Sequence, residues 1–182
     1  MARKTTEALE RERIAESIAR DLPPDAGGYS LSSATAVPLR RNLRGLWGVI
    51  AHEVGGEPYV ERLASRSLKG AELVDIAYSA QYEFKESICL KRMDVDGRAE
   101  LPEGSVAYSF RQRLALSWDL EGPERLRVRP EMGYQYTSLD EAPAAVKEME
   151  AAGDDLVILF RIEGDELVLE EGDDIKRLRR LA

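Results

Sequence analysis

A run of sixteen residues, Ser105–Leu120, alternates between apolar and polar side chains almost without interruption. Because successive side chains of a strand point to opposite faces, this pattern predicts one long β-strand with a dry and a wet face. A sheet of such strands must curve over its apolar face, closing into a barrel or lying under a helix. The only polar member of the apolar face is Gln112. That face carries Val106, Tyr108, Phe110, Gln112, Leu114, Leu116, Trp118 and Leu120.

Shorter alternating runs surround this strand and complete a sheet. They predict strands at 46–54, 74–90, 126–136, 156–163, 166–170 and 175–181. Run 74–90 breaks phase at Glu86, and Asp94–Gly97 is predicted to be a turn. Helices are predicted at Thr6–Asp21 and at Leu139–Ala152. About eight strands in meander order predict a mainly β fold, an antiparallel up-and-down β-barrel with an N-terminal helix and a short helix before the last strands.

The long strand and the run after it predict a register. If Leu120 faces Leu126, apolar residues face each other along the inner side, and opposite charges face each other on the outer side. Pro130 then marks a bulge or a sheet edge. The predicted inner pairs are Trp118 with Val128, Leu114 with Met132, Gln112 with Tyr134 and Phe110 with Tyr136. The predicted outer pairs are Asp119 with Arg127 and Glu121 with Arg125.

The chain of 182 residues is long enough for one domain with appendages and a sizeable core. The predicted division is a helix and linker at 1–38, with a loose connection at 25–37, followed by the barrel domain at 39–182. The net charge of −8 argues against general nucleic-acid binding. The single cysteine, Cys89, cannot form an internal disulfide, which indicates a reducing compartment or no redox role.

Neither a leader nor a membrane anchor is visible. Met1–Arg20 is charged throughout, and the most apolar stretch, Tyr29–Ala51, is interrupted by Pro38 and three arginines. We therefore expect no transmembrane segment and a cytoplasmic protein.

The segment Leu43-Arg44-Gly45-Leu46-Trp47 resembles the Gly-x-Trp signature that opens the first strand of lipocalins and the wider calycin group. The ending from Phe160 to Leu169, with the basic strand after it, is similar to bacterial lipocalin-like domains. The resemblance covers roughly residues 39–181. It implies that Trp47 closes the floor of the barrel and that an arginine of the last strand packs across it. The last strand offers Arg177, Arg179 and Arg180 for this role.

Tyrosines are unusually frequent on the predicted inner faces. Each buried hydroxyl needs a hydrogen-bond partner, otherwise its burial costs about 1–3 kcal/mol. A set of tyrosines with a glutamine is satisfied more readily around water or a polar ligand than in a filled core. The alternative is a filled core whose hydroxyls reach the rim. The candidate ligand-binding residues are Tyr78, Tyr82, Tyr108, Phe110, Gln112, Trp118, Tyr134 and Tyr136.

Other chemistry-bearing residues give weaker signals. His52 is the only histidine, and no second histidine or cysteine completes a metal-ligand set with it. Cys89 is out of phase with its apolar neighbours and is predicted to face outward as an inert residue. Asp94-x-Asp96-Gly97 begins like a calcium loop but lacks the later oxygen ligands. We expect no metal and no cofactor.

Five arginines fall on the predicted outer faces of two paired strands. They predict either a solvated face that pairs with Asp119, Glu121 and Glu131, or a contact surface for an acidic protein partner. These residues are Arg111, Arg113, Arg125, Arg127 and Arg129.

Three functions remain open. The favoured one is non-enzymatic binding of a small, partly polar hydrophobic molecule inside a tyrosine-rich barrel. The second is a protein-interaction module with a filled barrel, acting through its basic outer face or its N-terminal helix. The third is an enzyme, for which Glu86 is the single acid in phase with an apolar face and would have to act with a tyrosine, an uncommon arrangement.

Overall fold

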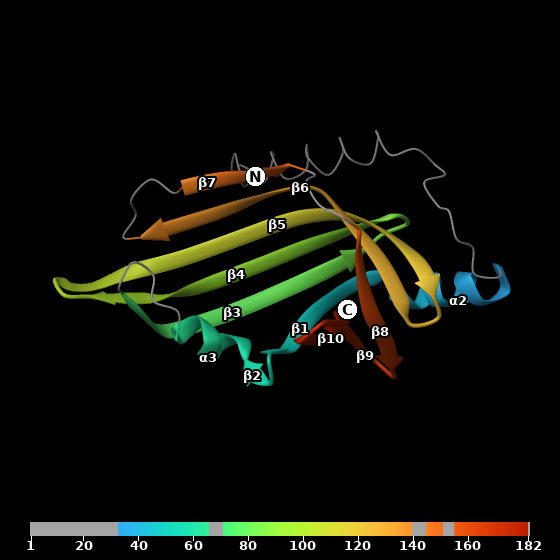
Figure 1. Ribbon diagram of the computed structural model, residues 1–182, viewed down its shortest axis with the longest axis horizontal. Coiled ribbons are helices and arrows are strands. Elements are labelled where there is room, and N and C mark those ends of the chain that lie inside the picture. The colour runs from blue at the N-terminus through green and yellow to red at the C-terminus, as the bar shows by residue number, and fades with distance from the viewer. Residues whose placement is uncertain (1–32, 66–70, 140–144, 151–154, 182) are drawn as a thin grey trace, which may run out of the picture.

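The structure is a computed structural model that describes residues 33–65, 71–139, 145–150 and 155–181. Most of these residues lie in paired β-strands. Within these ranges, ten strands form one antiparallel sheet, and eight of them close into a β-barrel (Figure 1). The barrel strands follow the order β10-β9-β8-β6-β5-β4-β3-β1, and the pairing of β1 with β10 completes the ring. The predicted fold class, a mainly β antiparallel barrel in meander order, is confirmed. The predicted helix at Thr6–Asp21 lies outside the described residues.

The barrel strands differ in length, from the 6 residues of β9 to the 19 of β5. Two more strands pair outside the ring, β2 (Glu57–Pro58) with β1 and β7 (Ala145–Glu150) with β6, and the described helices are α2 (Ser33–Leu43) and α3 (Tyr59–Ala64). The strands of the ring are β1 (Gly45–Val54), β3 (Glu72–Phe84), β4 (Ile88–Leu101), β5 (Gly104–Gly122), β6 (Arg125–Leu139), β8 (Leu156–Glu163), β9 (Glu166–Glu171) and β10 (Asp174–Arg180).

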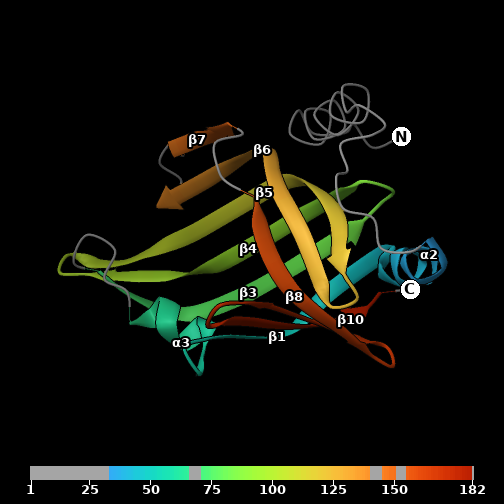
Figure 2. The same cartoon turned by 45° about the vertical axis from the view of Figure 1, so that its right-hand side comes forward.

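Two short strand pairings, which we call seams, join the long strands β3 to β6 to the shorter strands β8, β9, β10 and β1. β1 pairs with β3 only through residues 45–48, and β6 pairs with β8 only through residues 125–128. Both seams lie at the same end of the barrel, the end covered by α2 (Figures 1 and 2). Beyond them the two groups of strands diverge, so the barrel is closed at one end and flared at the other.

The predicted helix at Leu139–Ala152 is wrong over residues 145–150, which form β7. Since β6 leaves β8 after Val128, its remaining backbone N–H and C=O groups need partners, and β7 pairs with Met132–Thr137. Helix α2 also differs from prediction, because it begins at Ser33 within the expected loose connection.

The predicted single strand at 74–90 is two strands, and the break at Glu86 is the turn between them. β4 continues through Asp94–Gly97, so the turn predicted there is wrong. The aspartates of this segment lie on the outer face, and Gly97 allows the close approach of β3, because a Cβ at this position would be 3.0 Å from the Val74 carbonyl oxygen. With the phase of β4 set by its own turn, Cys89 faces inward and is buried, contrary to the prediction.

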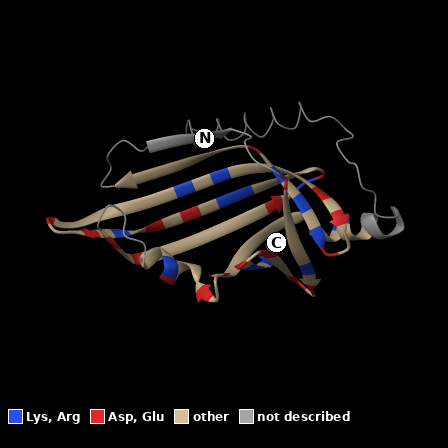
Figure 3. Cartoon of the chain, in the orientation of Figure 1, with Lys and Arg blue, Asp and Glu red and all other residues tan. Residues whose placement is uncertain are grey.

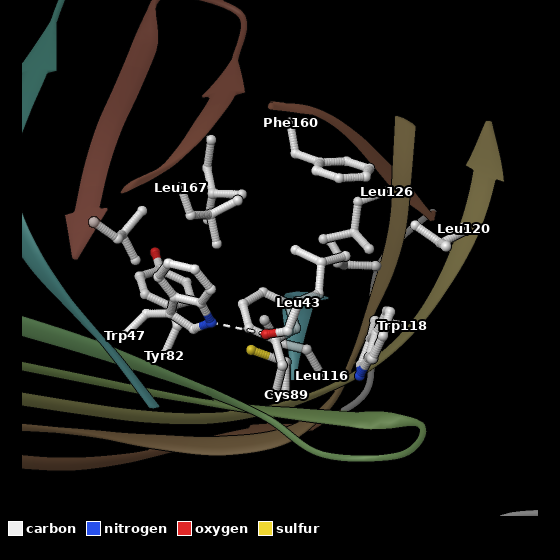
Figure 4. Packing of buried hydrophobic residues seen from close by; sticks show 14 residues of the cluster. Leu43, Trp47, Tyr82, Cys89, Leu116, Trp118, Leu120, Leu126, Phe160 and Leu167 are labelled. Carbon is white, nitrogen blue, oxygen red and sulfur yellow. Dashed lines mark hydrogen bonds between the residues drawn. The ribbon is translucent and has the colours of Figure 1, made fainter. Parts of the chain in front are cut away.

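The main core fills the closed end of the barrel. It is built around Trp47, Tyr82 and Trp118, with leucines contributed by β5, β6, β9, β10 and α2 (Figure 4). A second cluster lies toward the flared end, where Leu63 of α3 and Tyr108 of β5 pack with residues of β3 and β4. Alternation along β5 places its even-numbered residues in both clusters, as the sixteen-residue pattern predicts.

The β5–β6 register follows the prediction at first and then shifts. Leu120 pairs with Leu126, and Asp119 pairs with Arg127, as predicted. A bulge next to Pro130 then adds one residue to β6, so that Met132 pairs with Ala115 rather than with Leu114. Because a one-residue shift exchanges the two faces of a strand, all predicted pairs beyond this point are wrong.

Gly133 follows the bulge and lies against β5 without room for a side chain. A Cβ at this position would be 2.4 Å from Leu114 Cδ2 and 2.5 Å from the carbonyl oxygen of Arg113. We predict that Gly133→Ala lowers the free energy of unfolding by about 1–3 kcal/mol in urea denaturation, since β5 and β6 must move apart. Gly122→Ala is the matched control, because its Cβ would meet only Arg125 at 3.7 Å or more. Equal effects of the two substitutions would contradict the register.

Candidate functional site

The floor of the barrel is built around Trp47. Its side chain is 1% exposed, and its indole Nε1–H donates a hydrogen bond of 2.7 Å to the carbonyl oxygen of Leu43, the last residue of α2 (Figure 4). The guanidinium group of Arg180 lies over the Trp47 ring, 4.3 Å from its centroid. The same group donates hydrogen bonds to the carbonyl oxygens of Asn42 and Arg44, at and just after the end of α2. One arginine of the last strand therefore joins α2, β1 and β10.

The arginines predicted for this role alongside Arg180 are placed elsewhere. Arg177 and Arg179 are exposed on the outer face of β10, where Arg179 pairs with Glu166 at 2.7 Å. The inner face of β10 carries the even positions, since Leu178 is fully buried in the core. The assignment of the floor to Arg177 and Arg179 is thus corrected to Arg180.

The predicted ligand-binding residues are divided among four places. Tyr82 and Trp118 belong to the packed core at the closed end. A second group, Tyr78, Tyr108 and Phe110, lies in the cluster toward the flared end.

Gln112 lies on β5 between these clusters and is 8% exposed. In the described part of the chain, no donor reaches its side-chain oxygen Oε1. This buried carbonyl oxygen faces the barrel interior with an unused acceptor.

Tyr134 and Tyr136 do not lie in the interior. The bulge pairs them with Arg113 and Arg111, which point away from the core. Both tyrosines are therefore on the outer face, and their predicted inward position is wrong.

A cluster of aromatic and polar side chains connects β1, β3, β10 and α3 toward the flared end. His52 accepts or donates at both ring nitrogens: Nδ1 lies 2.8 Å from the Tyr78 hydroxyl, and Nε2 lies 2.9 Å from Asp174 Oδ1. Because the carboxylate can only accept, Nε2–H donates to Asp174, and in the neutral imidazole Nδ1 accepts from Tyr78. Tyr59, the first residue of α3, stacks on His52 at 4.1 Å and meets Tyr78 edge-on at 5.2 Å.

Two lysines point into the barrel near this cluster. Lys176 is 7% exposed and ion-pairs with Asp174. Burial alone raises the pKa of Asp174, but hydrogen bonds from His52 and Lys176 outweigh it and lower that pKa to about 2. Lys91 lies opposite Tyr82, with its ammonium 5.9 Å from the ring centroid. Burial lowers the pKa of Lys91, and the charge of Lys176 lowers it further.

The interior groups are poorly arranged for acid–base or nucleophilic catalysis. Burial, with the charges of Tyr59 and Asp174, raises the pKa of Tyr78, so its hydroxyl stays protonated. Burial also raises the pKa of the Cys89 thiol, which disfavours the nucleophilic thiolate. Glu86, the acid considered for catalysis, lies in the turn after β3, where its side chain is 81% exposed and pairs with Arg44.

The outer-face arginines are paired with acidic residues, and the acidic positions in the middle of β4 lie beside the basic positions of β5 (Figure 3). Arg111 pairs with Asp96 at 2.6 Å, and Arg113 with Asp94 at 2.5 Å. The predicted partner Glu121 binds Arg127 at 2.5 Å and Arg125 at 3.4 Å. The other predicted acids bind elsewhere: Asp119 pairs with Arg40 of α2, and Glu131 accepts from Ser117.

Among the described residues, no group of three or more His, Cys, Asp or Glu side chains could hold a metal ion. No helix in these ranges is long and apolar enough to cross a membrane. Comparison with protein-family models, with curated protein sequences and with solved structures gives no match. The class that the structure itself defines is a closed eight-stranded antiparallel β-barrel.

Sequence analysis missed the two inward lysines and the role of His52. Lys91 is in phase with Cys89, Met93 and Val95, which places it on the inner face of β4. The prediction of a single strand over 74–90 does not include this phase. His52 turns inward because a bulge at Ile50 shifts the phase of β1 after Val49, and no sequence signal marks this bulge.

The floor contact has a measurable effect on stability. We predict that Arg180→Met lowers the free energy of unfolding by about 1–2 kcal/mol, because it removes the cation–π contact with Trp47 and two hydrogen bonds to α2. Arg177→Met removes an equal charge from the outer face of the same strand and should change stability little. A larger effect of the Arg177 substitution, measured by urea denaturation, would reverse the assignment.

The carboxylate of Asp174 gives a pH-dependent contribution to stability. Its pKa is lower in the folded chain than in the unfolded chain, so its contribution is present above about pH 4 and is lost as the pH falls toward about 2. Asp174→Asn should therefore be less stable than the wild type near neutral pH. The difference should shrink between about pH 4 and pH 2 in urea titrations. A difference that is constant over this range would refute the ionic role of Asp174.

Proposed function

We propose that this chain is a lipocalin-like binding protein that holds a small, partly polar hydrophobic molecule inside its barrel without transforming it. The family resemblance is supported by the floor, where the tryptophan of the Gly-Leu-Trp segment is covered by an arginine of the last strand. The positions of the two seams also support a binding function, because a barrel with one closed and one flared end gives a ligand a single direction of entry.

The observation that carries the proposal is the buried, unsatisfied oxygen of Gln112. A buried acceptor without a donor costs about 1–3 kcal/mol, and a core that only has to be packed avoids this cost with an apolar residue. A bound molecule with one donor group offsets the cost. The neighbouring Phe110 and Leu114 are partly buried and provide an apolar surface for the rest of such a molecule.

The interior is favoured over the outer face as the binding surface. The outer arginines already have carboxylate partners, so an acidic protein would have to displace existing ion pairs. The interior instead contains polar groups whose bonding capacity is not used.

The test uses N-phenyl-1-naphthylamine, a neutral aromatic amine with one N–H donor that fluoresces in apolar surroundings. We predict that it binds the wild-type chain and that Gln112→Leu raises its Kd about tenfold, since one buried hydrogen bond is lost. Tyr134→Leu, on the outer face of the adjacent strand, should leave the Kd unchanged. Native mass spectrometry of the purified wild type would identify a co-purifying molecule.

Two results would count against the proposal. Absence of probe binding would favour a filled barrel, and the search would move to protein partners. Equal Kd changes for the Gln112 and Tyr134 substitutions would place the probe outside the barrel.

A further inference from the structure

An ammonium group lies inside the barrel without a carboxylate partner. Lys91 is on the inner face of β4, between Tyr82 of β3 and Leu114 of β5. In the part of the chain that the structure describes, no aspartate or glutamate lies within ion-pair distance of Lys91, which is partly buried and has its ammonium group over the Tyr82 ring. A cation–π contact at 5.9 Å compensates only part of the lost hydration of an ammonium group.

The charges around Lys91 leave a positive excess. Lys176 projects from β10 and pairs with Asp174, which also accepts a hydrogen bond from His52. This partly buried carboxylate is therefore already shared by two donors. The other acid whose charge acts on Lys91 is Glu171, at the exposed end of β9. Two ammonium groups and one shared carboxylate thus face the interior, with one positive charge unpaired.

Keeping this charge costs stability. Burial and the neighbouring Lys176 both lower the pKa of Lys91, which means that the empty barrel resists its protonated form. Replacement of a buried charged group by an apolar one of similar volume is commonly neutral or stabilising. A lysine at this position is therefore explained better by a ligand than by the fold.

We propose that Lys91 and Lys176 bind the head group of a singly charged amphipathic anion, a carboxylate attached to a hydrophobic chain. One negative charge matches the one unpaired positive charge. The hydrophobic chain runs toward the flared end, along the partly buried apolar residues Val106, Phe110 and Leu139. This inference rests on the proposed function and adds the charge of the ligand to it.

The test compares two probes of equal chain length, decanoate and 1-decanol, by isothermal titration calorimetry on the full chain near neutral pH. Decanoate should bind the wild type about tenfold to a hundredfold more tightly than decanol, because its carboxylate makes a charge-assisted contact with a partly buried ammonium group. Lys91→Met should remove most of this advantage and leave decanol affinity unchanged. Lys85→Met, which removes an exposed lysine from the turn after β3, should leave the advantage intact.

The outcomes separate this inference from the proposed function. Binding of decanol and decanoate with equal affinity, or an advantage that survives in Lys91→Met, overturns the anion site and leaves a neutral-ligand barrel. Binding of neither probe overturns both.

A stability measurement adds an independent readout. Without ligand, Lys91→Met should unfold at the same or a higher urea concentration than the wild type, because a partly buried charge without a carboxylate partner is removed. Decanoate should raise the midpoint of the wild type more than that of the variant. A variant that is clearly less stable than the wild type would mean that Lys91 has a structural role, and would overturn the inference.

Discussion

Strand pairing closes this barrel at one end only, and the arrangement of the interior depends on that constraint. The seams β1–β3 and β6–β8 are four residue pairs each, and both lie beside α2. With so few pairs, the ends of the seams must be held together by side chains. Trp47 and Arg180 do this from β1 and β10, and Arg40 of α2 does it from the other side, over the ring of Trp118 and in an ion pair with Asp119.

Beyond the seams the strands separate, and the chemistry of the inner face changes. At the closed end the inner face is aromatic and aliphatic, with Phe84 packed edge-on against Trp118 at 5.5 Å. Farther along it carries lysines, a glutamine and the cluster around His52. A packed core stabilises the fold, whereas buried polar groups contribute only when they find partners. The two ends of the barrel therefore differ in composition. The closed end is packed mainly with apolar side chains, although the indole N–H of Trp118 has no partner among the described residues, and the other end carries the lysines, Gln112 and the cluster around His52.

The sequence predicts the fold well because alternation is a local signal. Strand β5, the last three strands and the start of the β5–β6 register are all predicted by period-two patterns. The changes of phase are signalled less completely: Pro130 marks one bulge and Glu86 interrupts its run, but nothing in the sequence marks the bulge at Ile50. The bulges at Ile50 and Pro130 and the turn at Glu86 each exchange the inner and outer faces of the residues after them, which moved Tyr134 outward and brought His52 and Lys91 inward. The floor tryptophan could be identified from its segment, but the choice of Arg180 over Arg177 required the register of β10.

Cys89 can serve as a probe of how often the closed end of the barrel opens. It is the only cysteine of the chain, is 1% exposed and packs in the core that closes the barrel. A thiol reagent can reach it only when the closed end opens, and burial raises its pKa, so reaction in the folded state is slow. The rate at which it is labelled therefore reports how often the seams separate, much as the exchange rate of a core amide reports local opening. The wild-type chain thus contains a single built-in probe for the opening of its own barrel.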